Sequence, residues 1–241
     1  MSLMQRVLHV IGDYSGYKLA QDYWDSRNQP DAVFIWIPKS AGTSLHKAIG
    51  ARKHKSVRSV RFRFSQRGIV TFGHMDYRQL VQQGFVSRLF DSRAFKFAFA
   101  RNPYDRAVSL YAYLRDAVGL IQRNVDFLTF LRNIGDQGTA SIGLYNARGL
   151  SHCNPQVRWL DGVDVDFIGH IENLNEDVRL IAKKLGIETP QIPHENPTRR
   201  GRAEEYYCRE SLELVRYIYD EDFKAFGYET DESAVFGNSG S

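Results

Sequence analysis

The stretch Val33–Leu45 constrains the fold more than any other part of the chain. Its sequence is Val-Phe-Ile-Trp-Ile-Pro-Lys-Ser-Ala-Gly-Thr-Ser-Leu. The first five residues are apolar without alternation, which is typical of a strand buried on both faces of a parallel sheet. Pro38 has no N–H to donate and ends the strand, while Leu45, Ala48 and Ile49 recur at helical spacing. We therefore predict a strand, a tight loop and a helix.

This strand–loop–helix unit is predicted to bind an anion. Such a loop directs several backbone N–H groups, and the positive end of a helix, toward one point. Lys39 adds a mobile positive charge, and Thr43 and Ser44 add hydroxyl donors. The stretch differs from the phosphate loop of nucleotide-hydrolysing enzymes, G-x-x-x-x-G-K-[ST], because its lysine precedes Gly42 by three residues. A purely structural strand–helix turn is the alternative.

Length and composition predict one soluble domain, residues 1–241. The chain has 241 residues, of which 43% are hydrophobic and 25% are charged, as in soluble globular proteins. The apolar run Val7–Ile11 is broken by His9, unlike a signal peptide, and no stretch approaches the roughly 20 apolar residues of a membrane span. The two cysteines, Cys153 and Cys208, do not make a disulfide framework. We expect a cytoplasmic protein without a membrane span.

Positive charge is concentrated in one segment. Lysine plus arginine number 32 against 28 acidic residues, and Lys47–Arg67 holds eight lysines and arginines and no acidic residue. Such a run either lines a groove for an anionic substrate or forms a solvated face. Within it, Val60–Phe64 alternates apolar residues with arginine, which predicts a half-exposed strand.

Hydrophobic periodicity predicts the remaining elements. We expect strands at 69–72, 95–100 and 163–168, and helices at 16–27, 77–83, 103–118, 125–134, 173–185 and 204–219. Residues 135–155 are rich in Gly, Asn and Ser and are expected to form loops near a substrate entrance. Strands that alternate with helices predict an α/β fold: a central, mainly parallel sheet flanked by helices, with its core at about 32–228.

A second anion site is predicted where the strand 95–100 ends. Asn102 is a good N-cap for the helix that follows. The carboxyl ends of parallel strands meet at one edge of a sheet, which is where open α/β sheets bind ligands. Arg101 and Ser109, from one strand–helix unit, would suit a phosphate. An ion pair between Arg101 and Asp105 is the alternative.

Together the two segments resemble a known family. Pro38–Ser44 is similar to the 5′-phosphosulfate loop of sulfotransferases that use 3′-phosphoadenosine 5′-phosphosulfate (PAPS), and Arg101–Ser109 is similar to their 3′-phosphate motif. The likeness is to the branch that holds Golgi carbohydrate sulfotransferases and their bacterial relatives. Shorter matches are Phe72-Gly73-His74, Asn154-Pro155-Gln156 with Trp159-Leu160, and Asp166–Leu174. The membrane anchor of the Golgi enzymes is not seen in this sequence.

The resemblance implies a P-loop-like sulfotransferase fold. It also implies transfer of a sulfuryl group from PAPS to a hydroxyl or amine, with adenosine 3′,5′-bisphosphate (PAP) as product. Lys39 would stabilise the leaving phosphate oxygen. Arg101 and Ser109 would bind the 3′-phosphate, and Arg200 would close over it. The 5′-phosphosulfate would be held by Ser40, Ala41, Gly42, Thr43 and Ser44. No metal is expected, because the transferred group carries less negative charge than a phosphoryl group.

An acceptor hydroxyl needs a general base, and histidine suits neutral pH. Of the seven histidines, His74 is best placed, at the end of a strand expected beside the opening one. Related carbohydrate sulfotransferases carry a catalytic histidine or glutamate near this position. A structural histidine is the alternative. His46, His170 and His194 are less well placed.

Three functions compete on the sequence. A phosphate-loop kinase would need Mg²⁺ and the G-x-x-x-x-G-K-[ST] motif, which the chain lacks. A non-catalytic module would use the basic run Lys47–Arg67 to bind nucleic acid or acidic glycan, and would not need Lys39. We favour a PAPS-dependent sulfotransferase whose acceptor contains a sugar, without nucleic acid as a partner. The sequence carries no signal for the oligomeric state.

Overall fold

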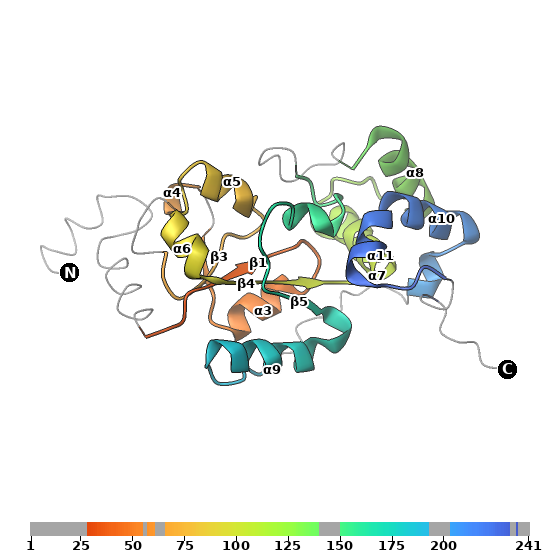
Figure 1. The fold of residues 1–241 in the computed structure, drawn as a ribbon. Helices are drawn as coiled ribbons and strands as arrows, with labels where there is room; N and C mark the ends of the chain where they lie inside the picture. Colours follow the sequence, from red (N-terminus) through yellow and green to blue (C-terminus); the bar gives the residue numbers. More distant parts are fainter. Residues whose placement is uncertain are drawn as a thin grey trace, which may run out of the picture.

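The computed structural model describes residues 28–54, 57–60, 66–139, 150–192, 203–231 and 235. Within these ranges a five-stranded sheet runs through the molecule with helices on both faces (Figure 1). The strands are β1 (Ala32–Ile35), β2 (Arg52–Lys53), β3 (Ile69–Thr71), β4 (Phe95–Ala100) and β5 (Phe167–His170). Their order is β2-β3-β1-β4-β5 and every pairing is parallel. The predicted α/β fold with a parallel sheet is confirmed.

The α-helices of the described residues lie between and after the strands. They are α3 (Gly42–Ala48), α4 (Val57–Val60), α5 (Tyr77–Gln82), α6 (Arg88–Arg93), α7 (Pro103–Ala112), α8 (Phe127–Gln137), α9 (Leu174–Leu185), α10 (Arg209–Ile218) and α11 (Asp220–Phe226). A π-helical turn, Tyr113–Ala117, continues α7, and short 3-10 helices lie at Gln156–Trp159, Ile171–Asn173 and Ala203–Tyr206. Among the described residues, no helix combines the length and the apolar character needed to cross a membrane.

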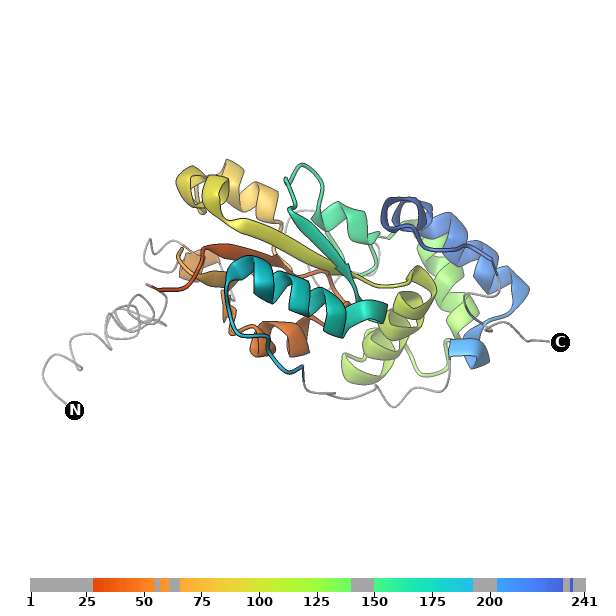
Figure 2. The same ribbon diagram turned by 60° about the horizontal axis from the view of Figure 1, so that its bottom comes forward.

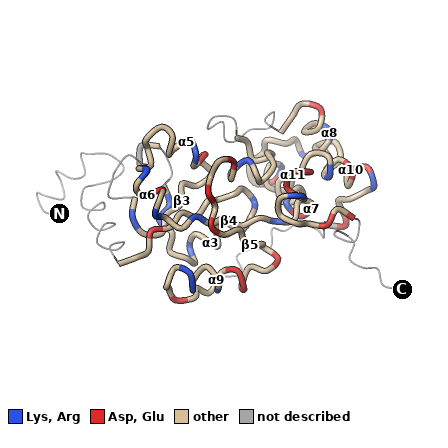
Figure 3. The backbone as a smooth tube through the Cα atoms, in the orientation of Figure 1, with Lys and Arg blue, Asp and Glu red and all other residues tan. Residues whose placement is uncertain are grey.

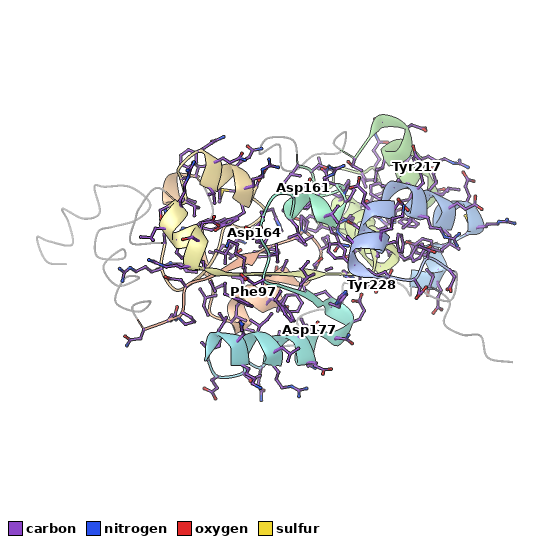
Figure 4. All side chains as sticks on the ribbon, in the orientation of Figure 1. Phe97, Asp161, Asp164, Asp177, Tyr217 and Tyr228 are labelled. Atoms are coloured by element: carbon purple, nitrogen blue, oxygen red, sulfur yellow. The ribbon has the colours of Figure 1, made fainter. Side chains whose placement is uncertain are left out.

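The alternation of side chains along β1 divides the core of the sheet into two layers. Val33 and Ile35 pack on the face covered by α5 and α6. Phe34 faces the other side, where α3 and α9 lie, and Phe97 of β4 joins it there (Figures 1 and 4). Burying a side chain of this size contributes about 1.5–3 kcal/mol, so both layers hold β1 in place.

A third apolar cluster lies beyond the carboxyl end of β4, where α7, α8, α10 and α11 pack together (Figure 2). Tyr104 and Tyr111 of α7 and Phe223 of α11 are buried in it. On its outside, charges of both signs are interspersed (Figure 3), and Arg132 of α8 pairs with Glu210 of α10 at 2.6 Å. This helical cluster anchors the polypeptide directly after β4.

The predicted elements at 69–72, 77–83, 95–100 and 173–185 are confirmed within a residue or two. The predicted strand at 163–168 instead begins at Phe167. The predicted helix at 204–219 is interrupted: α10 starts after Cys208, whose N–H donates to Ser211 Oγ (2.8 Å). β2 and α6 were not predicted.

The predicted strand over Val60–Phe64 is wrong at its first residue, because Val60 ends the short helix α4. Its other residues lie outside the described ranges, as does the helix predicted at 16–27. The helix predicted over 103–118 exists, but its last turn is π-helical from Tyr113 to Ala117.

Candidate active site

The candidate site lies where the three central strands end. β3, β1 and β4 are neighbours and parallel, so their carboxyl ends meet at one edge of the sheet. After β1 the chain continues to β2 and β3 on one side, whereas after β4 it continues to β5 on the other side. Such a reversal of direction opens a crevice between the two strands, and open α/β sheets bind ligands there.

A cavity of about 300 Å³ lies at this edge. Its lining combines most of the predicted site residues with three that were not predicted. The lining residues are Trp36, Lys39, Ala41, Gly42, Thr43, Ser44, His74, Arg101, Ser109, Tyr113 and His152. The structure therefore brings the two predicted anion segments and the predicted base to one cavity.

The loop between β1 and α3 has an unusual backbone. Lys39 (φ 68°) and Ala41 (φ 49°) are the described non-glycine residues with positive φ. Within α3 the first bond of the ladder runs from the N–H of Leu45 to the carbonyl of Ala41 (3.1 Å). The preceding N–H groups, at the start of the helix, have no partner inside it. The loop and the helix start therefore present backbone donors to the cavity.

Lys39 extends over the aromatic wall of the cavity. Its Nζ lies 4.3 Å from the centre of the Tyr113 ring, within the range of a cation–π interaction. Tyr113 is the first residue of the π-helical turn that follows α7. Such turns are frequent at functional sites. Here the turn places an aromatic ring beneath the only charged side chain of the loop.

Arg101 lies between the two anion segments. Its Nη1 donates to the carbonyl of Lys39 (3.4 Å), and its Nη2 lies 3.6 Å from Asp105 Oδ2. The predicted alternative, an ion pair with Asp105, is thus present, although Arg101 also lines the cavity. The Asp105 side chain is 43% exposed, and an exposed pair is worth only about 0–1 kcal/mol. It is therefore a weak competitor for a phosphate. Ser109, buried in α7, lines the same wall.

The geometry of His74 fixes which ring nitrogen carries the proton. Its Nδ1 lies 2.8 Å from the carbonyl oxygen of Trp36. A carbonyl can only accept, so Nδ1–H is the donor and Nε2 of the neutral ring has the lone pair. Burial lowers the pKa of His74 to about 4, and the nearby cations Lys53 and Lys39 act in the same direction. The imidazole is therefore neutral at pH 7, as a general base must be.

His152 and Trp36 complete the lining beside His74. The rings of His74 and His152 are edge to face with centres 5.4 Å apart. Burial lowers the pKa of His152 to about 3, and the neighbouring His74 and Arg106 add to the effect. Trp36 packs against His74 (5.1 Å) and His46 (4.8 Å). Two neutral imidazoles therefore face the cavity near the ammonium of Lys39.

One predicted site residue among those that the structure describes, Ser40, does not line this cavity. Ser40 is 1% exposed and its hydroxyl donates to Gln156 Oε1 (3.1 Å), behind the loop. Arg200 lies outside the described residues, as does His194. Among the described residues, no group of three or more His, Cys, Asp or Glu side chains is placed to hold a metal ion.

The residues that sequence reasoning missed differ in the signal they offered. Tyr113 follows Ser109 by four residues and so shares its helix face; this spacing could have been used. His152 lies in the segment 135–155, which was predicted to lie near a substrate entrance. Gln156 belongs to a motif, Asn154-Pro155-Gln156, that was recognised without a role.

Comparisons with known proteins agree on one family. The model of the sulfotransferase family matches residues 22–229. Carbohydrate sulfotransferase 10 of Xenopus laevis is 26% identical over 167 residues, which are 56% of this chain and 47% of that protein. The human protein of the same name is 27% identical over the same shares. The chain thus spans about half the length of these curated relatives. An uncharacterized protein of Archaeoglobus fulgidus is 33% identical over 108 residues, 45% of this chain and 80% of that protein.

Two solved structures are also similar. A sulfotransferase from Alicyclobacillus acidocaldarius has a TM-score of 0.47 and 17% identity, covering 83% of this chain and 97% of that chain. Mouse sulfotransferase SULT7A1 complexed with PAP has a TM-score of 0.49 and 15% identity, covering 86% and 89%. The family model carries the conclusion, because it extends over 22–229, most of the sequence: this chain belongs to the sulfotransferase family.

Proposed function

We propose that this chain transfers a sulfuryl group from PAPS to a hydroxyl or amine of a carbohydrate acceptor. The observation that carries the proposal is the meeting of Lys39, Arg101, Ser109 and His74 in one cavity of about 300 Å³. The donor set fits a ligand with two separate anionic groups. Backbone N–H groups and Lys39 serve one group, while Arg101 and Ser109 serve the other.

The loop and Lys39 would hold the 5′-phosphosulfate. PAPS supplies the sulfuryl group: the bond from sulfur to the 5′-phosphate oxygen breaks as the acceptor oxygen bonds to sulfur. Lys39 would neutralise the charge that develops on the leaving oxygen. Its ammonium rests on Tyr113, so a short movement of a flexible side chain brings it to an anion. Thr43 and Ser44, at the start of α3, add hydroxyl donors.

The second half of the site would distinguish PAPS from nucleotides without a 3′-phosphate. Arg101 offers a planar fork of N–H donors, which matches a phosphate. The Ser109 hydroxyl lies on the same wall, two turns into α7. Arg200 stays a predicted contact of the 3′-phosphate.

His74 would take the proton from the acceptor. Nδ1–H is held by the Trp36 carbonyl (2.8 Å), so Nε2 is the atom that accepts the proton. His74 lines the cavity together with Lys39. In this proposal His74 removes the proton from the acceptor and Lys39 neutralises the charge on the leaving oxygen.

The carbohydrate acceptor is supported by the relatives. The curated proteins that match are carbohydrate sulfotransferases, at 26% and 27% identity. Aromatic residues line the cavity (Trp36 and Tyr113) beside His74, and such rings offer apolar faces to a sugar. A kinase and a non-catalytic anion-binding module are not favoured, because the family model is that of sulfotransferases.

Calorimetric titration tests the donor. We expect PAP to bind much more tightly than AMP, because only PAP engages Arg101 and Ser109 as well as the loop. Lys39→Ala and Arg101→Ala are each expected to abolish sulfuryl transfer from radiolabelled PAPS without unfolding the protein. Arg209→Ala and Lys224→Ala are matched controls, since their side chains are 87% and 74% exposed and neither residue lines the cavity. Equal affinity for PAP and AMP would overturn the proposal. Activity that persists in EDTA is expected from the prediction that no metal is needed.

A further inference from the structure

One buried side chain joins the two anion segments. Gln156 is 0% exposed. Its Oε1 accepts hydrogen bonds from Ser40 Oγ (3.1 Å) and from the N–H of Arg101 (2.9 Å). Its Nε2 donates to the carbonyl of Arg101 (2.8 Å). The phosphosulfate loop and the residue after β4 are therefore bonded to the same amide group.

These contacts use most of what a glutamine can offer. The amide has two acceptor lone pairs and two N–H donors, and three of the four are committed to Ser40 and Arg101. The Gln156 amide bonds to both the N–H and the carbonyl of Arg101, so it fixes the backbone orientation of Arg101 and the direction in which its side chain points. A buried polar group left without its partner is unfavourable, so neither segment can shift without breaking a bond.

The backbone of Gln156 is itself fixed by hydrogen bonds to another helix. Its N–H and that of Val157 donate to the carboxylate of Asp222 (2.8 and 3.0 Å). Asp222 of α11 faces the guanidinium of Arg106 at 3.9 Å, and both side chains are buried. Arg106 Nε donates to the carbonyl of Pro38 (3.1 Å). The network thus reaches the phosphosulfate loop a second time, one residue before Lys39.

We propose that Gln156 is a positioning residue that sets the separation of the two phosphate subsites. This inference rests on the proposed use of PAPS, whose 3′- and 5′-groups sit on one ribose at a fixed spacing. A site built from two loops can bind both groups at once only if the loops keep that spacing. Gln156 does not itself line the cavity; its side chain bonds to Ser40 and Arg101, so it acts through them.

The proposal predicts a pattern across three ligands. Gln156→Met keeps the length of the side chain and removes its hydrogen bonds. We expect it to weaken PAP, which needs both subsites at once, by about tenfold or more beyond any loss for 5′-AMP or 3′-AMP, within the range of about 5–150-fold seen for coupled sites. Ser40→Ala removes only the arm to the phosphosulfate loop, so it should weaken 5′-AMP and PAP while leaving 3′-AMP unchanged.

Gln66 provides a matched control. It too is a buried glutamine, 7% exposed, whose amide makes three hydrogen bonds. Its partners are the carbonyls of Val60 and Phe85 and the N–H of Ser87, remote from the cavity. Gln66→Met should lower the melting temperature much as Gln156→Met does, and should leave the affinity for all three ligands at the wild-type value.

The experiment is calorimetric titration of PAP, 5′-AMP and 3′-AMP into the wild type and the three variants, with melting temperatures recorded alongside. A loss of PAP affinity in Gln156→Met that exceeds its loss for either monophosphate, with Gln66→Met normal, supports the proposal; equal fold-losses for all three ligands overturn it. Equal affinities in these two variants overturn it. If Gln156→Met does not fold, Ser40→Ala decides: PAP affinity at the wild-type value overturns the proposal. A wild type that binds PAP no better than AMP instead overturns the use of PAPS.

Discussion

The close approach of Trp36 to Gly42 makes a sharp test of how the loop between β1 and α3 is built. A Cβ atom at position 42 would lie 1.7 Å from Trp36 Nε1 and 2.1 Å from its Cδ1. Ordinary contact needs about 3.5 Å, so Gly42→Ala requires the indole to withdraw by about 1.8 Å. The indole has little room: it is 5% exposed, with His46 stacked at 4.8 Å and Lys53 Nζ at 4.0 Å.

The magnitude follows from this overlap. Inserting a methyl group into a packed site costs typically about 1–3 kcal/mol. For a chain of this length each 1 kcal/mol lowers the melting temperature by about 2–4 °C, so Gly42→Ala should melt about 2–12 °C below the wild type. PAP should also bind more weakly, because α3 starts at Gly42. Calorimetry measures both quantities.

Two comparisons make the reasoning refutable. Gly135→Ala places a Cβ in α8 at an ordinary 3.8 Å from Leu214, and should be neutral or stabilising by up to about 1 kcal/mol. Trp36→Leu removes the atoms that clash, so the double variant Gly42→Ala/Trp36→Leu should lose less than the sum of the single losses, by about 0.5–3 kcal/mol. The explanation by overlap would be refuted if the stability losses of the two single variants were additive. It would also be refuted if Gly42→Ala had the melting temperature and the PAP affinity of the wild type.

Three further predictions concern the titrating and aromatic groups of the cavity. Because burial lowers the pKa of His74 to about 4, kcat/KM should stay level from pH 8 to about pH 5 and fall only below it; an acid limb near pH 6.5 would contradict His74 as the base. Below pH 6.5 His74 and His152 become protonated in the unfolded chain, whereas in the folded protein their lowered pKa values keep them neutral. The free energy of unfolding measured in urea should therefore decline as the pH falls from about 6.5, down to about pH 4 for the contribution of His74 and about pH 3 for that of His152. His152→Ala should make this decline shallower. An unchanged dependence of the free energy of unfolding on pH would refute the lowered pKa of His152. Tyr113→Leu removes the aromatic ring under Lys39, a contact worth about 0.5–2 kcal/mol, and should lower kcat/KM about threefold or more. Tyr113→Phe keeps the ring and should have a kcat/KM near that of the wild type. Equal values of kcat/KM for the two variants would show that the contact between Lys39 and the ring does not contribute to the reaction.

The parts of the molecule that the sequence predicts well depend on local signals. The opening strand, which was predicted to reach Ile37 and ends at Ile35 in the structure, the loop that follows it and the N-cap at Asn102 are each encoded by adjacent residues. In the structure Asn102 Oδ1 accepts from the N–H of Tyr104 (2.9 Å), as a cap does. Because parallel strands bring their carboxyl ends to one edge, these local signals also predict that Lys39, Arg101 and His74 meet.

Contacts between distant segments were not predictable in the same way. Gln156 bonds Ser40 from 116 positions away, and nothing in the residues around either one encodes the pairing. His152 packs against His74, and its backbone carbonyl accepts a hydrogen bond from Arg106, 46 positions away (2.9 Å). The start of α10 at Arg209 depends on a bond between Cys208 and Ser211 that hydrophobic periodicity does not reveal.

The left-handed backbone at Lys39 and Ala41 couples the stability of the protein to ligand binding. Non-glycine residues in this conformation lie about 1–3 kcal/mol above their preferred one, so the loop exists only while β1, α7 and the segment around Gln156 hold it. A partly unfolded chain would lose the loop and with it the ligand. Binding and folding then form a single equilibrium, in which a ligand at about 100 times its Kd adds about 2.7 kcal/mol to the free energy of unfolding. On the proposed use of PAPS, the chain without its donor would be the less stable form, and its degradation by proteases would rise as the donor is depleted.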